Sequence, residues 1–151
     1  MGPSFPLLLL FVLLTATVSM TLIIELTPSA ISTSDFIVGS LGNGSPIIVR
    51  TNGVCKMQGT SLSYSGLTNN TRQYLALSID QDNDLFEISV DGSVAASTST
   101  LAAFAAVGTN KNSVSVGSSS ASADMTVHNV GLYAGYMTPA QIVAAVARDF
   151  L

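Results

Sequence analysis

The sequence predicts an all-β protein, an antiparallel sandwich of two sheets with one short C-terminal helix. The first observation is the stretch from Tyr74 to Gly92, where two runs alternate apolar and polar residues with the period of half-buried strands. The second is the presence of turn dipeptides such as Asn52-Gly53 and Asp91-Gly92, which favour the positive φ of tight hairpins. The third is that a convincing helix signal occurs at one place, near the C-terminus.

The centre of the predicted sandwich is a three-stranded meander. Its first two strands each place apolar side chains on one face, namely Leu75, Leu77 and Ile79, then Phe86, Ile88 and Val90. Ser78, Glu87 and Ser89 point to the opposite face. The connection at 80–84 is too short for anything but an antiparallel hairpin, and the turn at Asp91-Gly92 leads into a third strand through Val94.

Residues 7–24 form an apolar stretch that has two interpretations. Its length fits a membrane span or a signal peptide. However, no Lys or Arg precedes Arg50, and within 15–26 the aliphatic residues hold the even positions while the hydroxyl-bearing residues hold odd ones. We therefore expect a strand at 15–26 with its hydroxyls facing solvent, preceded by a buried strand at 7–14. A targeting segment that is cleaved off remains the alternative.

The other strands are shorter. We expect them at 35–40, 46–51, 113–117 and 125–133, with one or two more across 54–64, separated by turn-forming or polar segments. In the last of these, Val127 and Val130 are three residues apart before the alternation resumes at Leu132, which predicts a β-bulge near His128. For the Ala, Ser and Thr-rich segment 95–123 we expect that Leu101, Phe104 and Val107 pack one part against a sheet, with a flexible surface excursion as the alternative.

The helix begins at Thr138-Pro139-Ala140-Gln141. This run combines an N-cap residue, a proline at the first helical position and a capping box. Ile142, Val146 and Phe150 form one apolar stripe. We expect this stripe to cover one end or edge of the sandwich.

Composition excludes several classes of protein. A chain of 151 residues corresponds to one domain, 1–151. The net charge is −4 and the five basic residues are scattered, so we expect no nucleic-acid partner. One Cys and one His exclude an intrachain disulfide and a structural zinc site, and Cys55 is expected to be a small buried hydrophobe. We expect no cofactor and no membrane partner.

Four motifs, in their order along the chain, resemble the concanavalin A-like, laminin G-type jelly-roll domain. They are Val90-Asp91-Gly92, Val116-Gly117, Val130-Gly131-Leu132-Tyr133, and Met137-Thr138 with Gln141-Ile142. The resemblance covers residues 15–145 and implies a jelly-roll sandwich. In the family, the first strand of the central hairpin commonly opens with an aromatic residue that is often Trp. This sequence departs from that pattern because it has Tyr74 at this position.

The alternating carboxylates Asp80, Asp82 and Asp84 are the metal candidate, because carboxylate oxygens are the ligands that Ca²⁺ prefers. The sixth position of this loop is Leu85, where a helix-loop-helix calcium site needs Gly. A solvated hairpin turn is therefore the main interpretation and calcium binding the alternative. Some members of the resembled family bind Ca²⁺.

No catalytic residues are predicted. Glu87-Ile88-Ser89-Val90-Asp91 is similar to the Glu-x-Asp-x-Glu strand of jelly-roll glucanases, but Ser89 replaces the middle carboxylate. His128 is the one available histidine, and the sequence has no Gly-x-Ser-x-Gly elbow for a nucleophilic serine.

Tyrosines and amide side chains are the candidates for contact with a glycan or a protein partner. Aromatic platforms with neighbouring hydrogen-bonding groups are typical of sugar sites on β-sandwiches, although core packing is equally natural for a tyrosine. The candidates are Tyr64, Asn69, Asn70, Tyr74, Asn83 and Tyr136.

We weigh three functions from different classes. The first is a non-catalytic structural or interaction module that docks onto other protein subunits in a homo-oligomer or a larger assembly. The resemblance connects it with bacteriophage virion components, either capsid decoration or tail fibre proteins. The alternative is a secreted, lectin-like carbohydrate-binding protein, for which residues 1–19 would be cleaved. The third is a jelly-roll endoglycanase.

Overall fold

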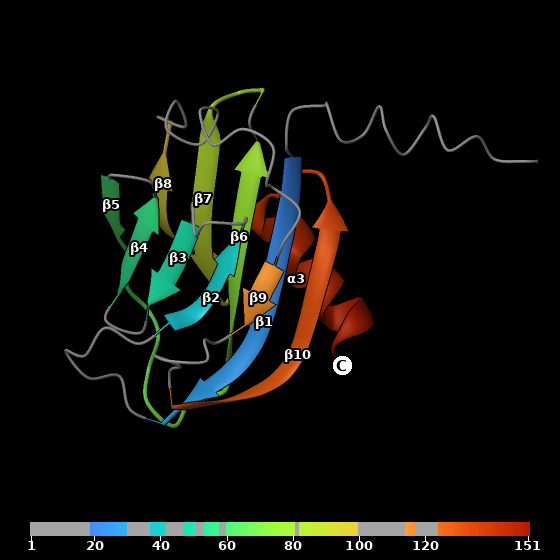
Figure 1. The fold of residues 1–151 in the computed structure, drawn as a ribbon. Helices are drawn as coiled ribbons and strands as arrows, with labels where there is room; N and C mark the ends of the chain where they lie inside the picture. The colour runs from blue at the N-terminus through green and yellow to red at the C-terminus, as the bar shows by residue number, and fades with distance from the viewer. Residues whose placement is uncertain are drawn as a thin grey trace, which may run out of the picture.

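The computed structural model describes residues 19–29, 37–41, 47–50, 53–57, 60–80, 82–99, 114–116 and 124–151. These residues form two five-stranded antiparallel sheets that face each other, with a helix on the outer side of the first sheet (Figure 1). Sheet A has the order β10-β1-β6-β7-β8 and sheet B the order β5-β4-β3-β2-β9. The predicted all-β jelly-roll sandwich with one C-terminal helix is confirmed.

The bounds of the strands agree with the sequence pattern in most places. Sheet A consists of β1 (Ser19–Pro28), β6 (Gln73–Asp80), β7 (Leu85–Val90), β8 (Ser93–Thr98) and β10 (Met125–Ala134). Sheet B consists of β2 (Ile37–Leu41), β3 (Ile47–Arg50), β4 (Val54–Met57), β5 (Thr60–Ser63) and β9 (Val114–Val116). The predicted strand at 7–14 lies outside the described residues, and so do residues 100–113 and 117–123 of the Ala, Ser and Thr-rich segment. No helix in the described ranges is long and apolar enough to span a membrane.

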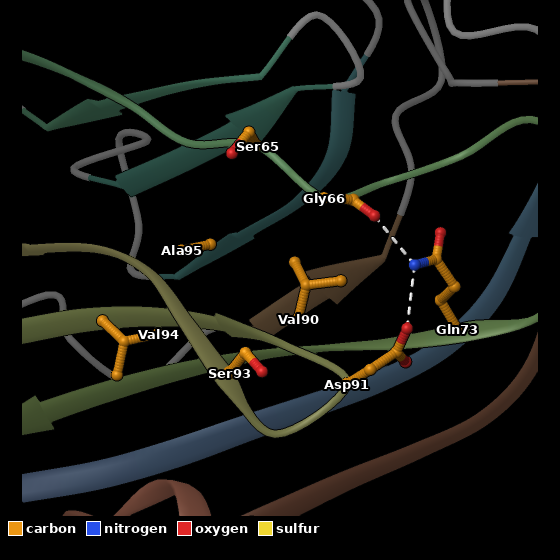
Figure 2. A pocket seen from close by; sticks show the side chains of 8 residues that line it. All are labelled: Ser65, Gly66, Gln73, Val90, Asp91, Ser93, Val94 and Ala95. Carbon is orange, nitrogen blue, oxygen red and sulfur yellow. Dashed lines mark hydrogen bonds between the residues drawn. The ribbon is translucent and has the colours of Figure 1, made fainter.

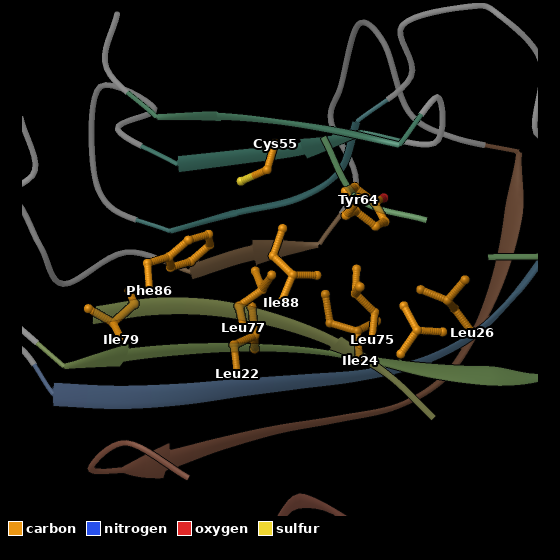
Figure 3. Close-up of a cluster of buried hydrophobic side chains, with 11 residues drawn as sticks. Leu22, Ile24, Leu26, Cys55, Tyr64, Leu75, Leu77, Ile79, Phe86 and Ile88 are labelled. Atoms are coloured by element: carbon orange, nitrogen blue, oxygen red, sulfur yellow. The ribbon is translucent and has the colours of Figure 1, made fainter. Parts of the chain in front are cut away.

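The core lies between the two sheets (Figure 3). Alternate residues of three sheet A strands point into it: Leu22, Ile24 and Leu26 from β1, Leu75, Leu77 and Ile79 from β6, and Phe86, Ile88 and Val90 from β7. The inward faces predicted for the meander are therefore confirmed. Cys55 packs against this cluster from β4, and burial raises the pKa of its thiol to about 12, which keeps it protonated and unreactive.

The outer face of sheet A is also buried around Thr21 and Ser78, so the prediction that the hydroxyls of the first strand face solvent is wrong at Thr21. Thr21 is 0% exposed and Ser78 is 1% exposed. The Thr21 hydroxyl accepts a hydrogen bond from the Met137 N–H at 3.0 Å and lies 3.0 Å from the Gly135 carbonyl. The Ser78 hydroxyl donates to the Met137 carbonyl at 3.0 Å. Backbone groups thus take the place that solvent was expected to hold.

Helix α3 (Pro139–Asp149) lies across this outer face rather than at an end or edge of the sandwich, which corrects the predicted position (Figure 1). Ile142, Ala145 and Val146 of the helix pack against Ile23 and Ala76 of sheet A. The two sheet residues are fully buried, so the helix forms a third layer with a small core of its own.

The start of the helix agrees with the prediction. Thr138 is the N-cap and Pro139 the first helical residue. The Thr138 N–H donates to Gln141 Oε1 at 2.9 Å, and the Gln141 N–H donates to Thr138 Oγ1 at 3.4 Å. This reciprocal capping box stabilises the first turn.

The predicted β-bulge in the last strand is confirmed. Glu25 pairs with Asn129 and the next residue, Leu26, pairs with Val127, so His128 is the extra residue. The His128 ring nitrogen Nε2 lies 2.8 Å from the Thr27 hydroxyl. The bulge is why Val127 and Val130 share a face although they are three residues apart.

Candidate functional site

A hollow of about 260 Å³ opens at the end of the sandwich where β5 leads into β6 and where β7 turns into β8 (Figure 2). Val90, Val94 and Ala95 form its apolar lining. The polar lining comes from Ser65, Gly66, Gln73, Asp91 and Ser93. Concave sites with an apolar surface and a few convergent polar groups are typical of small-ligand sites.

Gln73 links the two sides of the hollow (Figure 2). Its Nε2 donates to the Gly66 carbonyl and to Asp91 Oδ2, both at 2.8 Å, while its Oε1 accepts from the Thr68 N–H at 2.7 Å. The residue is 7% exposed, and both of its amide N–H groups are used. Gln73 therefore holds the 66–72 connection against the β7–β8 turn and offers no free donor to a ligand.

Asp91 is fixed by the turn that it begins. Its Oδ1 accepts from the Tyr74 N–H at 3.0 Å, and its own N–H donates to the Tyr74 carbonyl at 3.0 Å. Asp91 has a φ of +50° and Gly92 one of +75°, as expected of the predicted tight turn. Each carboxylate oxygen accepts one of these intramolecular bonds, from Tyr74 or from Gln73, and keeps a lone pair for a further donor.

The sequence pattern does not identify most of the residues that line the hollow. The sequence pattern identifies Asp91 as a turn residue and as part of a glucanase-like strand, and it does not identify Gln73, Ser65 or Ser93. A signal was present in the strand pattern, because Gln73 occupies the inward-facing series that continues with Leu75 and Leu77. A polar residue in an otherwise apolar series needs a hydrogen-bonding reason, and this one has three partners.

The predicted contact residues divide between the two ends of the sandwich. Asn69 and Asn70 lie exposed in the connection that precedes β6, at the same end as the hollow. Tyr74, at the start of β6, is half-buried on the helix side, and burial raises the pKa of its hydroxyl. Asn83 and Tyr136 lie at the opposite end, near the last residue of β6 and the first of β1. A single site containing all of these residues is therefore not formed.

Tyr64 is a core residue, which corrects its assignment as a surface contact. It is 6% exposed and its side chain points between the sheets (Figure 3). Its hydroxyl donates to the Arg50 carbonyl, and burial raises the pKa of that hydroxyl well above its ordinary value. No face of this ring is available to a sugar.

The aspartates at 80, 82 and 84, which were the candidate calcium ligands, do not form a metal-binding group among the described residues. Asp80 accepts from the Asn83 N–H at 3.3 Å and from Asn83 Nδ2 at 2.7 Å, so its carboxylate caps the turn. Asp84 follows in the same turn with a φ of +53°. Within the described ranges, no group of three or more His, Cys, Asp or Glu side chains could hold a metal ion. These contacts favour the solvated hairpin turn.

Glu87 and Asp91 do not form a catalytic pair. Glu87 lies on the outer face of sheet A, is 9% exposed, and its Oε1 has no hydrogen-bond partner among the described residues. Burial, followed by the charge of Glu87, raises the pKa of Tyr136 above its ordinary value. Asp91 is held by Gln73 at the hollow. Two carboxyl groups facing one sugar across a groove, as glycoside hydrolysis requires, are not found in the described part of the chain.

The guanidinium of Arg72, which precedes Gln73 in the sequence, is hydrogen-bonded to Glu25. Its Nε donates to Glu25 Oε1 at 2.8 Å and its second nitrogen donates to Glu25 Oε2 at 3.0 Å. Asn129 Nδ2 also donates to Glu25 Oε2, at 2.6 Å. Glu25 is 6% exposed, and its hydrogen bond with Arg72 is the main cause that lowers the pKa of its carboxyl. This cluster ties the 66–72 connection to β1 and β10.

We expect Glu25 to make stability depend on pH in the acid range. Its pKa is lowered in the folded state, so its contribution is complete above the unfolded value of about 4.3 and is lost as the pH falls through the lowered folded value. Urea denaturation between pH 7 and pH 3 should show stability falling below about pH 5, and Glu25→Gln should flatten that decline. The exposed Asp124→Asn is the matched control. Equal acid slopes for the parent and Glu25→Gln would contradict this role.

No protein-family model matches the sequence, and no curated protein sequence matches it. Solved structures do. The CBM40 carbohydrate-binding module of the Ruminococcus gnavus IT-sialidase, bound to α2,3 sialyllactose, matches with a TM-score of 0.65 at 14% identity, over 89% of this chain and 85% of that chain. The Trypanosoma rangeli sialidase in complex with 2,3-difluorosialic acid matches with a TM-score of 0.62 at 14% identity, over 85% of this chain.

The likeness is one of fold. This chain spans 22% of the length of the Trypanosoma rangeli sialidase, so it corresponds to one part of that enzyme. It spans 85% of the Ruminococcus gnavus module, which is therefore matched nearly from end to end. Both comparisons agree with the jelly-roll architecture that the sequence predicts.

Proposed function

We propose that this chain is a non-catalytic carbohydrate-binding module that holds a glycan at the hollow. The observation that carries the proposal is the match with the Ruminococcus gnavus module, which covers 89% of this chain and 85% of that one. A fold alone does not specify a ligand, so the proposal also depends on the chemistry of the hollow.

The lining of the hollow suits a sugar. The hydroxyls of Ser65 and Ser93 and the open lone pairs of Asp91 are partners for sugar hydroxyls. Val90 and Val94 supply an apolar surface for the C–H groups of a pyranose ring. The volume of about 260 Å³ is slightly below the roughly 300–1,000 Å³ of drug-sized sites, which fits one sugar unit at a chain end.

The other hypotheses from the sequence have less support. The neighbours described above favour the lectin-like alternative over a virion component, so capsid decoration and tail fibre roles, with their oligomeric protein partners, stay predictions. An endoglycanase needs a pair of carboxylates that face one sugar, and the described ranges of this chain contain no such pair. Secretion is the localisation that agrees best with a glycan-binding role, and it too stays a prediction.

A substitution that fills the hollow should remove binding. Ser93 is exposed on its rim, so Ser93→Trp places an indole in the volume of the sugar. We expect at least a tenfold loss of affinity on a glycan array and in calorimetric titration, on the order of 1.4 kcal/mol. Ser97→Trp, also exposed on β8 but outside the lining, should bind like the parent.

The test has a second variant in case the first perturbs the turn. Ser65→Trp blocks the hollow from the opposite side and should have the same effect. Circular dichroism establishes that each variant is folded. Undiminished binding by both folded variants would overturn the hollow as the site, and the absence of any glycan binding by the parent would overturn the function.

A further inference from the structure

We propose that the hollow selects uncharged sugars and disfavours those that carry a carboxylate. This inference rests on the proposed function and concerns the same site. It arises from the donors and charges of the lining residues, and it sets this chain apart from the sialyllactose-binding module that shares its fold.

The hollow offers little to an anion. Asp91 places a carboxylate in the lining, and none of the described lining residues is a cation. Among the described lining residues Gln73 alone carries a side-chain amide, and it uses one N–H on Gly66 and the other on Asp91. A bound carboxylate needs charged or strongly polar donors. It would find the hydroxyls of Ser65 and Ser93 beside a charge of its own sign.

Arg72, the basic residue next to Gln73 in the sequence, is not available to pair with a carboxylate in the hollow. Because successive side chains of an extended strand point to opposite faces, the Arg72 side chain points away from the face on which Gln73 borders the hollow. There it donates two hydrogen bonds to Glu25, a carboxylate that is 6% exposed. Turning Arg72 towards the hollow would leave the buried Glu25 with Asn129 as its remaining side-chain donor, which is unfavourable.

The same lining residues favour an uncharged sugar. Asp91 is already oriented by the N–H groups of Gln73 and Tyr74, so no side-chain freedom is lost when a ligand binds. Its open lone pairs accept from sugar hydroxyls, and hydrogen bonds to an ionised acceptor are stronger than neutral ones. The same carboxylate that repels an acidic sugar therefore favours a neutral one.

The experiment uses an array on which each neutral glycan is printed beside its sialylated counterpart, for example lactose beside 3′-sialyllactose. Like-charge repulsion at an exposed site corresponds to about a tenfold difference in affinity. We expect the parent chain to bind neutral members about tenfold more tightly at low salt. The difference should shrink in 0.5 M salt to roughly a few-fold, because salt screens the repulsion.

Ser93→Arg adds the missing cation at the rim and should move the preference towards the sialylated member of each pair. Ser97→Arg has the same net charge but places it outside the lining, so it should keep the parent's preference. Tighter binding of sialylated glycans by the parent would overturn this inference and leave the proposed function intact. An equal change in preference for Ser93→Arg and Ser97→Arg would assign the effect to net charge and overturn the role of the hollow. Binding of no glycan would overturn both proposals.

Discussion

Phe86→Ala should lower the free energy of unfolding by about 3–5 kcal/mol. Phe86 is fully buried and is the largest fully buried side chain in the described core. It lies between the sheets, paired in register with Ile79 and close to Cys55 of β4 (Figure 3). Removing the ring leaves a cavity that the two rigid sheets cannot close, so transfer and cavity costs add. Urea denaturation measures the change.

The control for this prediction is Leu132→Ala on the edge strand β10. Leu132 is also a large apolar residue, but it is 57% exposed, so the change should stay within about 0.5 kcal/mol. A loss of similar size for both variants would mean that burial between the sheets is not what stabilises the fold.

Gly92→Ala should destabilise the protein by about 2–5 kcal/mol, through two separate effects. The first is the backbone, because a φ of +75° costs an L-residue roughly 1–2 kcal/mol. The second is steric. A Cβ at this position would overlap Val143 Cγ2 of helix α3 and lie 3.0 Å from the Tyr74 hydroxyl, so the Val143 side chain or the helix that carries it must shift.

Gly135→Ala separates these effects. Gly135 has a φ of +88°, but a Cβ there would meet nothing within 4 Å, so this variant carries the backbone cost alone. Gly92→Ala should therefore cost about 1–3 kcal/mol more. Adding Val143→Ala to Gly92→Ala should recover part of that excess, because the two sites are in contact and their effects are not additive. Equal losses for the two glycine variants would show that α3 does not press on this turn.

The sequence pattern could predict the strands and the inner core because burial between two sheets alternates with the pleat. The inward orientation of Leu75, Leu77 and Ile79 follows from this alternation alone. What lies on the other face could not be read in this way. Thr21 and Ser78 are polar, yet they are buried because Gly135 and Met137, distant in the sequence, bring backbone carbonyls onto them. Alternation shows that a strand has two faces and does not show what covers the second.

The candidate site was harder to predict for a similar reason. Gln73 takes its role from Gly66, Thr68 and Asp91, and no local motif relates these positions. The sequence leaves Tyr64 open between a contact residue and a core residue, because a tyrosine suits both a sugar platform and a core with one hydroxyl acceptor. The acceptor that decides between them is the Arg50 carbonyl, which reaches the hydroxyl only in the folded chain.

The most direct test of the account is an NMR titration of the full chain with the neutral glycan that binds most tightly on the array. We expect the largest amide shift changes around the hollow, at Ser65, Gly66, Ser93 and Val94, with small changes elsewhere. Changes centred on Asn83 and Tyr136 at the opposite end of the sandwich, or no changes at any glycan concentration, would contradict it.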